Sequence, residues 1–252
     1  MAERADWLRR PSGVLHELVD IDVEAARAVV QSAIADADET WLAAAELREL
    51  LELYGIPFVA ERVAAGIDDA VHAAETLGYP VVVKTAEAGA HKTERGGVAL
   101  DLSDADEVRA AVERIGAPVI VQQYVCGGAE LLAGVVQDPV FGPLVAFGPG
   151  GVFAELIGDA GFRIAPLTDV DARELVLGGK GGTLVRGFRG TPPADVDALV
   201  ELVQRLGRLA EDLPELVELD LNPVIAQPTG CVVVDARARL VRVRGGRPVK
   251  GW

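Results

Sequence analysis

The sequence lacks any apolar run long enough to cross a membrane. Its longest stretch without a charged residue runs from Pro139 to Ala154, and proline and glycine interrupt it repeatedly. A membrane helix needs about 20 predominantly apolar residues. The first ten residues, MAERADWLRR, also lack the apolar segment of a signal peptide. We therefore expect a cytoplasmic protein with no membrane contact.

Positive charge is also scarce. The chain has 24 Lys and Arg residues against 39 Asp and Glu residues, which gives a formal net charge of −15. A surface of this sign disfavours nucleic acid and anionic membranes. It does not exclude a nucleotide, because a few local cations and a metal ion can outweigh a distant, screened negative field. We expect small-molecule substrates and no nucleic-acid partner.

Cysteine and histidine are rare. Cys126 and Cys231 have no metal-binding spacing, and in a cytosolic protein they are expected to be two buried thiols. Of the three histidines, His16 lies in a loose N-terminal segment and His72 in a predicted helix. His91 is therefore the candidate neutral nitrogen nucleophile, although a lone loop histidine is commonly just exposed to solvent.

Helical and strand patterns alternate along the chain. Apolar spacing predicts helices over 23–35, 40–54, 68–77, 104–115, 169–177 and 191–211. Thr191 is the expected cap of the last helix. Short apolar runs predict strands over 80–84, 98–102, 118–125, 130–137, 144–147, 216–225 and 231–236. The glycine-rich segment 178–182 is predicted to be a flexible loop, and the whole pattern indicates α/β or α+β layers.

Oxygen-bearing side chains cluster near the end of the chain. Because side chains of a strand alternate between its two faces, Glu218, Asp220 and Asn222 share one face of the predicted strand. Asp235 follows the next strand. Hard oxygen ligands of this kind suit Mg²⁺. A solvated polar face explains the same alternation equally well.

The loop after the strand PVVVK offers groups that suit a phosphate. Lys84 ends the apolar strand, where a charge needs a partner unless the side chain extends to solvent. Residues 85–97 then supply backbone N–H groups, cations and a hydroxyl, among them Lys92 and Thr93. The segment is not a Walker loop, because GxxxxGK[ST] is absent.

Glycines gather at Gly142, Gly148, Gly150 and Gly151. Glycine allows tight turns and a close approach of the backbone to a ligand. A purely structural turn accounts for the cluster equally well.

Taken in order, several segments resemble a known family. They are YGIPF at Tyr54, LGYPVVVK at 77–84, HKTERGGV at 91–98, GAELLAGVVQDPVFGP at 128–143, FGPGGVFAEL, FRIAPL, LVRGFRG at 184–190, ELDLNP at 218–223 and VVVDAR at 232–237. The set resembles the ATP-grasp (β) part of ADP-forming acetyl-CoA synthetases, and more distantly the nucleotide-binding subunit of succinyl-CoA synthetase. It covers roughly residues 40–240.

The resemblance implies an ATP-grasp fold in which two lobes clasp ATP or ADP. The small lobe would span about 59–121, and the large lobe about 40–58 plus 122–240. Residues 1–39 would form an N-terminal leader and helix, and residues 241–252 a C-terminal tail.

The resemblance also implies roles for single residues. Lys84 would contact the nucleotide phosphates, and the loop with Lys92 and Thr93 would close over them. Gln122 and Val125, in the hinge between the lobes, would bind adenine partly through backbone groups. Glu130 would hold the ribose, and Asn222 and Asp235 would be the ligands of Mg²⁺.

His91 matches the loop histidine that relays a phosphoryl group in the acetyl-CoA synthetase branch. The nucleotide subunit of succinyl-CoA synthetase has no histidine there, so the resemblance favours the former branch. Asp220 matches an acid that orients the phosphohistidine. A carboxylate suits this role, because it fixes the imidazole tautomer and stabilises positive charge on the ring.

The implied reaction is acyl-CoA + ADP + phosphate ⇌ acid + CoA + ATP. The sequence has no GxGxxG fingerprint for a CoA-binding module, so the resemblance implies a separate CoA-binding α subunit in a hetero-oligomer. One alternative is another ATP-grasp carboxylate ligase, which the HKT segment argues against because such ligases need no phosphohistidine. The other is a non-catalytic ATP-sensing regulatory module, and the presence together of Lys84, His91, Asp220, Asn222 and Asp235 argues against it.

Overall fold

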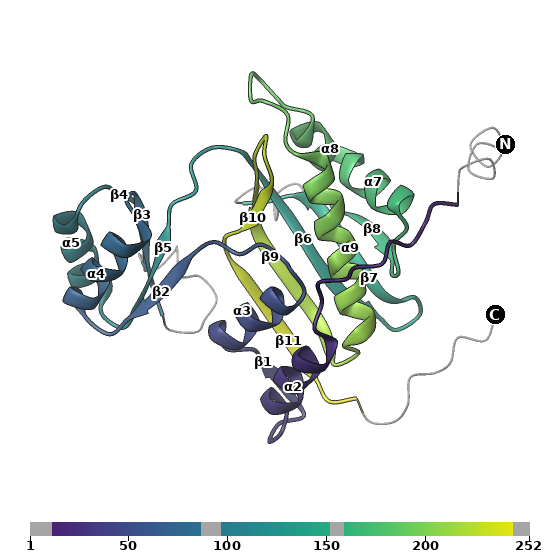
Figure 1. Cartoon of the computed structure of the whole chain (residues 1–252), viewed down its shortest axis with the longest axis horizontal. Helices are drawn as coiled ribbons and strands as arrows, with labels where there is room; N and C mark the ends of the chain where they lie inside the picture. Colours follow the sequence, from purple (N-terminus) through teal and green to yellow (C-terminus); the bar gives the residue numbers. More distant parts are fainter. Residues whose placement is uncertain (1–11, 87–96, 152–158, 244–252) are drawn as a thin grey trace. The chain divides into compact units, whose positions relative to one another are not determined.

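The computed structural model describes residues 12–86, 97–151 and 159–243, which divide into two compact units (Figure 1). The small unit is Val59–Cys126. The large unit contains the chain up to Phe58 and from Gly127 onward. Each unit has its own hydrophobic core. No helix in the described ranges is both long enough and apolar enough for a membrane span.

The small unit is an antiparallel four-stranded sheet with two helices. Its strand order is β2-β5-β3-β4, and both helices lie on the same side of it (Figure 1). The strands are β2 (Glu61–Ala64), β3 (Val81–Thr85), β4 (Val98–Leu102) and β5 (Val119–Gln123), and the helices are α4 (Ile67–Leu77) and α5 (Ala105–Ile115).

Local sequence explains the two helices. Asp104 caps α5 by accepting hydrogen bonds from the backbone N–H groups of Asp106 and Glu107, both at 2.9 Å. Gly78 and Gly116 end the helices with φ angles of +83° and +88°, which glycine adopts without a steric penalty. Because the apolar side chains of each helix recur on one face, that face packs against the sheet.

The large unit is built on a seven-stranded antiparallel sheet. The order is β1-β11-β9-β6-β7-β8, and β10 pairs with β9. The strands are β1 (Glu39–Trp41), β6 (Ala129–Asp138), β7 (Gly142–Pro149), β8 (Gly161–Ile164), β9 (Leu216–Ala226), β10 (Cys231–Val233) and β11 (Ala236–Val241). The helices are α2 (Val23–Ala33), α3 (Ala44–Leu53), α7 (Asp169–Leu177), α8 (Gly179–Val185) and α9 (Val196–Asp212).

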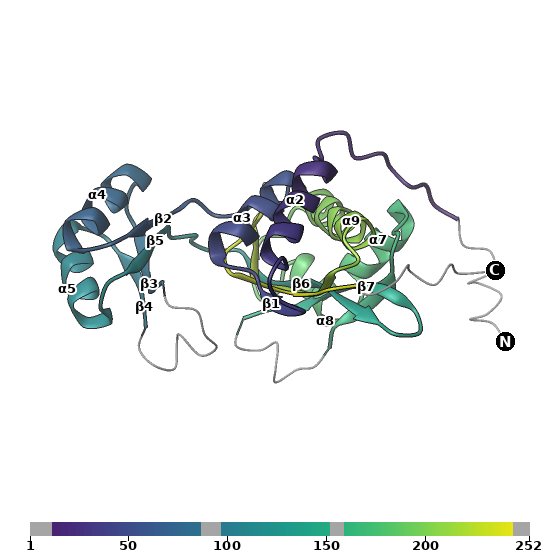
Figure 2. The same ribbon diagram turned by 90° about the horizontal axis from the view of Figure 1, so that it is seen from below.

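One face of this sheet forms the core. Leu131, Ala133 and Val135 of β6 alternate toward it and are fully or almost fully buried, as are Leu219 and Leu221 of β9. Figure 2 shows α2, α3, α7 and α9 on one side of the sheet. The intervening residues of the same strands therefore face away from the core.

A buried arginine ties three segments of the large unit together. Arg205 of α9 is only 7% exposed, and its guanidinium donates to the backbone oxygen of Tyr54 at 2.9 Å. It also donates to both carboxylate oxygens of Asp20 and to Glu201. Because each of these bonds satisfies part of a buried charge, Arg205 fastens the N-terminal segment and the end of α3 to α9.

Most predicted elements are present, but four of the predictions are wrong. The predicted helix over 40–54 begins only at Ala44, because residues 39–41 pair with β11 as β1. The predicted strand over 231–236 stops at Val233, and β11 follows it as a separate strand. Thr191 does not cap α9. The helix begins at Val196, and Asp195 is its N-cap. The two prolines after Thr191 favour an extended chain in front of the helix.

The glycine-rich segment 178–182 is the fourth error, because it enters helix α8 and is not a loop. A Cβ on Gly181 would lie 3.2 Å from the Cα of Gly148 in β7, and one on Gly182 would collide with the backbone oxygen of Leu177. Glycine is therefore required for close packing of α8 on its neighbours, and not for mobility.

The two cysteines differ from the expected pair of buried thiols. Cys126 is exposed, and Cys231 is half-buried. Burial, with a smaller contribution from the charge of Asp195, raises the pKa of the Cys231 thiol to about 12. Only Cys231 is thus close to the inert buried thiol that the sequence suggested.

We predict that Asp195→Ala lowers the free energy of unfolding by about 1–2 kcal/mol. Asp195 accepts hydrogen bonds from the N–H groups of Ala198 at 3.1 Å and Gly230 at 3.0 Å, and these bonds lower the pKa of its carboxyl. The stabilisation is therefore present at neutral pH and is lost as the pH falls through that lowered pKa. Urea unfolding at pH 7 and under acidic conditions measures both effects.

Asp197→Ala is the matched control for this prediction. Asp197 lies in the first turn of the same helix, and its side chain is 84% exposed in an ion pair with Arg173. Because exposed pairs contribute little, we expect a change of less than about 0.5 kcal/mol. Equal losses from the two variants would contradict the capping role of Asp195.

Candidate functional site

The first group of candidate residues lies in the small unit and centres on a buried lysine. Lys84, at the end of β3, is 8% exposed, and its Nζ lies 3.5 Å from Oε2 of Glu61 on β2. The same oxygen accepts a 2.8 Å hydrogen bond from Nε2 of Gln122 on β5. Lys84 is therefore a buried, paired cation, and the alternative of a lysine extending into solvent is wrong.

Strand alternation explains why these three side chains meet. Val81 and Val83 of β3 point into the helix-covered core, so Lys84 points to the opposite face of the sheet. Glu61 and Gln122 are direct cross-strand partners in the antiparallel pair β2–β5. The structure thus brings together Lys84 and Gln122, both predicted from the sequence, through a glutamate that the sequence analysis missed.

Glu61 escaped prediction because β2 is only four residues long. The segment Glu61–Ala64 carries two charged residues, and alternation over so few residues does not distinguish a strand from a loop. Val125, the other residue predicted to bind adenine, follows β5 and is half-buried. His91, Lys92 and Thr93 lie outside the described residues.

The second group lies in the large unit, at a bulge in β9. Between the pairs Leu131–Val224 and Ala133–Leu221, β9 has one residue more than β6. Asn222 lies in this irregular stretch, and its Oδ1 accepts a 2.8 Å hydrogen bond from the N–H of Gly151. Bulges reorient side chains locally, and this one presents an amide oxygen held in place by the backbone.

Asp235 is held next to Asn222 by the backbone. The N–H of Asn222 donates to the backbone oxygen of Asp235 at 3.0 Å, and the N–H of Val234 donates to that of Pro223 at 3.0 Å. Asn222 is half-buried, and Asp235 is exposed. The two predicted metal ligands are therefore neighbours across a strand connection.

Asp220 lies on β9 two residues before Asn222, on the face away from the core. Burial raises the pKa of its carboxyl, and the negative charges of Glu218 and Asp235 raise it further. Arg237 opposes this rise, because its Nε lies 3.3 Å from Oδ2 of Asp220. The result is a carboxyl group held close to three charged neighbours.

Glu130 is the second residue of β6 and lies beside the glycine turn. Its backbone oxygen accepts a 3.0 Å hydrogen bond from Gly150 N–H, and a Cβ on Gly151 would collide with its carboxylate. Gly151 also has a φ of +64° and gives its N–H to Asn222. Contacts within the protein therefore explain the glycine at position 151. Its N–H binds Asn222, and a Cβ would collide with Glu130.

The donors of this second group fit a hard cation. Asp220, Asn222 and Asp235 offer carboxylate and amide oxygens, and Asn222 Oδ1 keeps a second lone pair beside its bond to Gly151. Within residues 12–86, 97–151 and 159–243, no three Asp, Glu, His or Cys side chains form a metal-binding cluster. Two carboxylates and an amide oxygen nevertheless match the chemistry of Mg²⁺, which takes one or two carboxylates and otherwise keeps water and phosphate oxygens.

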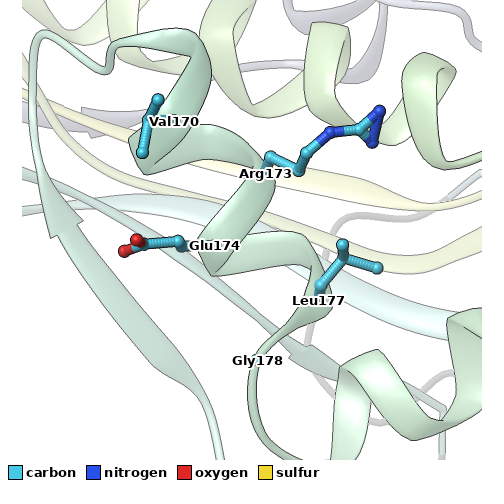
Figure 3. Close-up of a pocket in the computed structure, with 5 residues that line it drawn as sticks. All are labelled: Val170, Arg173, Glu174, Leu177 and Gly178. Carbon is cyan, nitrogen blue, oxygen red and sulfur yellow. The ribbon is translucent and has the colours of Figure 1, made fainter. Parts of the chain in front are cut away.

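A separate hollow on α7 has no part in either group. It has a volume of about 420 Å³ and is lined by Val170, Arg173, Glu174, Leu177 and Gly178 (Figure 3). Arg173 pairs with Asp197, and Glu174 pairs with Arg163. Its side chains come from one helix, and its two charges are engaged in surface ion pairs, so we assign it no role.

The chain matches the ATP-grasp domain family over residues 33–240. It is 36% identical over 228 residues to the beta subunit of acetate–CoA ligase (ADP-forming) I of Pyrococcus furiosus, which covers 85% of this chain and 97% of that protein. It is 39% identical over 232 residues to acetate–CoA ligase (ADP-forming) I of Archaeoglobus fulgidus. That match covers 86% of this chain and 34% of the relative, so the chain spans about a third of it.

Among solved structures, the chain resembles dinucleotide-forming acetyl-coenzyme A synthetase 1 of Ca. Korarchaeum cryptofilum. The TM-score is 0.76 at 38% identity, and the match covers 86% of this chain and 100% of that chain. That structure is a complex with coenzyme A and Mg-AMPPCP, and its phosphohistidine segment points towards the nucleotide binding site.

We predict that Asp220 titrates above the usual aspartate pKa of about 3.9, and that Arg237→Met raises its pKa further. The variant removes the cation that stabilises the ionised carboxylate. Carboxyl ¹³C NMR titration, with the resonance assigned by Asp220→Asn, measures both values.

Arg239→Met is the control for this titration. Arg239 pairs with Glu218 and Glu39, so its removal leaves the partner of Asp220 in place. A fall in the pKa of Asp220 after loss of Arg237, or equal shifts in both variants, would contradict the assignment.

Proposed function

Because this chain belongs to the ATP-grasp family, and within it to the beta subunits of ADP-forming acetate–CoA ligases, we propose that it is the nucleotide-binding half of an ADP-forming acyl-CoA synthetase. The reaction would be acyl-CoA + ADP + phosphate ⇌ acid + CoA + ATP. The main support is the match to nearly the whole length of a beta subunit. We assign the ATP-grasp domain to residues 40–240, with its small lobe at about 59–121.

Residues of the small unit, together with Glu130 of the large unit, would bind the nucleotide. Lys84, a buried cation, is suited to phosphate oxygens, because charge-assisted hydrogen bonds are stronger away from bulk water. Lys92 and Thr93 would add a second cation and a hydroxyl. Gln122 and Val125 would bind adenine at the hinge, and Glu130 would accept hydrogen bonds from the ribose.

Asn222 and Asp235 would hold Mg²⁺, which when bound neutralises phosphate charge and orients the phosphate oxygens. The chain's own contribution there is a fixed donor set. The bond from Gly151 N–H orients the amide of Asn222, and the backbone bond between Asn222 and Asp235 keeps the two residues adjacent. Little rearrangement would then be needed on binding.

His91 would carry the phosphoryl group between two chains. Acyl-CoA and phosphate would form an acyl phosphate and CoA on the partner. A neutral imidazole nitrogen of His91 would attack the phosphorus, which releases the acid and forms a P–N bond. The terminal oxygen of ADP would then displace the imidazole, so that ATP forms and His91 is regenerated. Asp220, beside the proposed metal ligands, would orient the loaded ring.

The partner would be a CoA-binding α subunit supplied by a separate chain, in a cytoplasmic hetero-oligomer. The Archaeoglobus relative is about three times as long as the match to this chain, whereas the Pyrococcus beta subunit is nearly the length of the match. From the similarity to separate beta subunits, we propose the split arrangement, in which the purified chain alone binds nucleotide but does not convert acyl-CoA.

We predict that His91→Ala abolishes acyl-CoA-driven ATP synthesis by the assembled pair and leaves Mg·ADP affinity within about twofold. The nucleophile would be lost while the ground-state contacts to nucleotide remain. Phosphate on the wild-type chain after incubation with ATP should be acid-labile and base-stable, and should be absent from His91→Ala. Substantial turnover by the His91→Ala pair would overturn the relay.

We predict that Asp235→Ala weakens Mg·ADP binding about tenfold or more, because a charged ligand to the cation is removed. Calorimetric titration of the chain with ADP, with and without Mg²⁺, tests this. The same substitution at exposed Asp197 should have no effect on affinity. If Asp235→Ala bound Mg·ADP as tightly as the wild type, the metal assignment would be wrong.

A further inference from the structure

We propose that Glu61 is a positioning residue for the nucleotide, which holds the ammonium group of Lys84 where phosphate oxygens reach it. The inference rests on the proposed nucleotide site and adds to it a residue that would touch neither phosphate nor base. Its evidence is the buried chain of contacts from Lys84 through Glu61 to Gln122.

The side chain of Lys84 crosses a neighbouring strand to reach Glu61. Lys84 lies on β3 and Glu61 on β2, with β5 between them. Adjacent strands lie about 4.8 Å apart, so the two backbones are separated by roughly twice that distance. Nζ nevertheless lies 3.5 Å from Oε2 of Glu61. The two long side chains therefore bridge the middle strand on the face away from the helices.

Glu61 is anchored by contacts other than its pairing with Lys84. Gln122, only 1% exposed, donates from Nε2 to Oε2 of Glu61 at 2.8 Å. Glu61 and Gln122 are also direct partners in the β2–β5 ladder, where side chains lie closest. The carboxylate of Glu61 is thus held by the sheet and by the 2.8 Å hydrogen bond from Gln122. Its distance to the ammonium group of Lys84, 3.5 Å, is longer.

Glu61 would act on a bound phosphate in two opposite ways. Its negative charge would repel a phosphate, and it would also keep a flexible, buried ammonium in one place. The lysine has three N–H donors, and a single carboxylate oxygen at 3.5 Å engages no more than one of them. Because a buried ammonium without a fixed anion loses a large stabilising interaction, we expect the positioning effect to exceed the repulsion.

The side chain of glutamine allows a selective test. Glu61→Gln removes the charge that faces Lys84 and keeps an amide oxygen that can accept the hydrogen bond from Gln122. We therefore expect this variant to bind Mg·ADP about tenfold more weakly, or ~1.4 kcal/mol, and to bind adenosine with unchanged affinity. Adenosine carries the base and ribose but no phosphate, so its binding does not depend on Lys84.

A double-mutant cycle with Lys84→Met identifies the partner of Glu61. Calorimetry of the full chain with Mg·ADP and with adenosine is carried out on the wild type, Glu61→Gln, Lys84→Met and the double variant, after thermal melting has verified folding. We expect the double variant to bind Mg·ADP no more weakly than Lys84→Met alone, because Glu61 acts through that lysine. Glu113→Gln, at an exposed position of α5, is the matched control and should bind like the wild type.

Glu61→Asp serves if Glu61→Gln does not fold. It keeps the charge near Lys84 but withdraws the carboxylate by one methylene, so we again expect weaker Mg·ADP binding and unchanged adenosine binding. Mg·ADP affinity of a folded Glu61 variant that equals or exceeds that of the wild type would overturn the inference. Independent, multiplicative effects of the two substitutions would also overturn it. A wild-type chain that binds no Mg·ADP would instead refute the proposed function, and the inference with it.

Discussion

The pairing of β6 with β9 is the constraint on which the large unit depends. Its antiparallel register places Gly134 opposite Asp220 and Val135 opposite Leu219, so the leucines of β9 enter the core while its acidic residues face outward. A shift by one residue would exchange the two faces and bury carboxylates. The bulge at Asn222 then allows Leu221 and Val224, three positions apart, both to reach the core.

The small unit shows a second principle, which is that its buried charge is balanced within its own sheet. Lys84 of β3 pairs with Glu61 of β2 across the intervening strand β5, and Gln122 of β5 donates a hydrogen bond to that glutamate. Arg205 in the large unit is balanced in the same way by Asp20, Glu201 and a backbone oxygen. The difference lies in what each network would do: the Arg205 contacts join structural segments, whereas the Lys84 contacts lie at residues proposed to bind nucleotide.

Glycine has two distinct structural uses in this chain. At Gly78 and Gly116 it provides a positive φ angle at a helix end, directly after the segments 68–77 and 104–115 that the apolar pattern predicts as helices. At Gly181 it provides space, because the helix approaches the backbone of Gly148 closely. Composition does not distinguish these uses from flexibility, so a glycine-rich helix was mistaken for a loop.

Most of the fold follows from the sequence by itself. Apolar periodicity located the main helices and strands, and the ordered motifs indicated an ATP-grasp fold, which the family match confirms. The adjacency of Asn222 and Asp235 was likewise expected from strand order. Only the tertiary structure revealed Glu61, the short strands β1, β2 and β8, the raised pKa of Asp220 and the helical state of residues 179–185. These features arise from pairing and burial between segments far apart in the chain, and local periodicity carries no information about such distant partners.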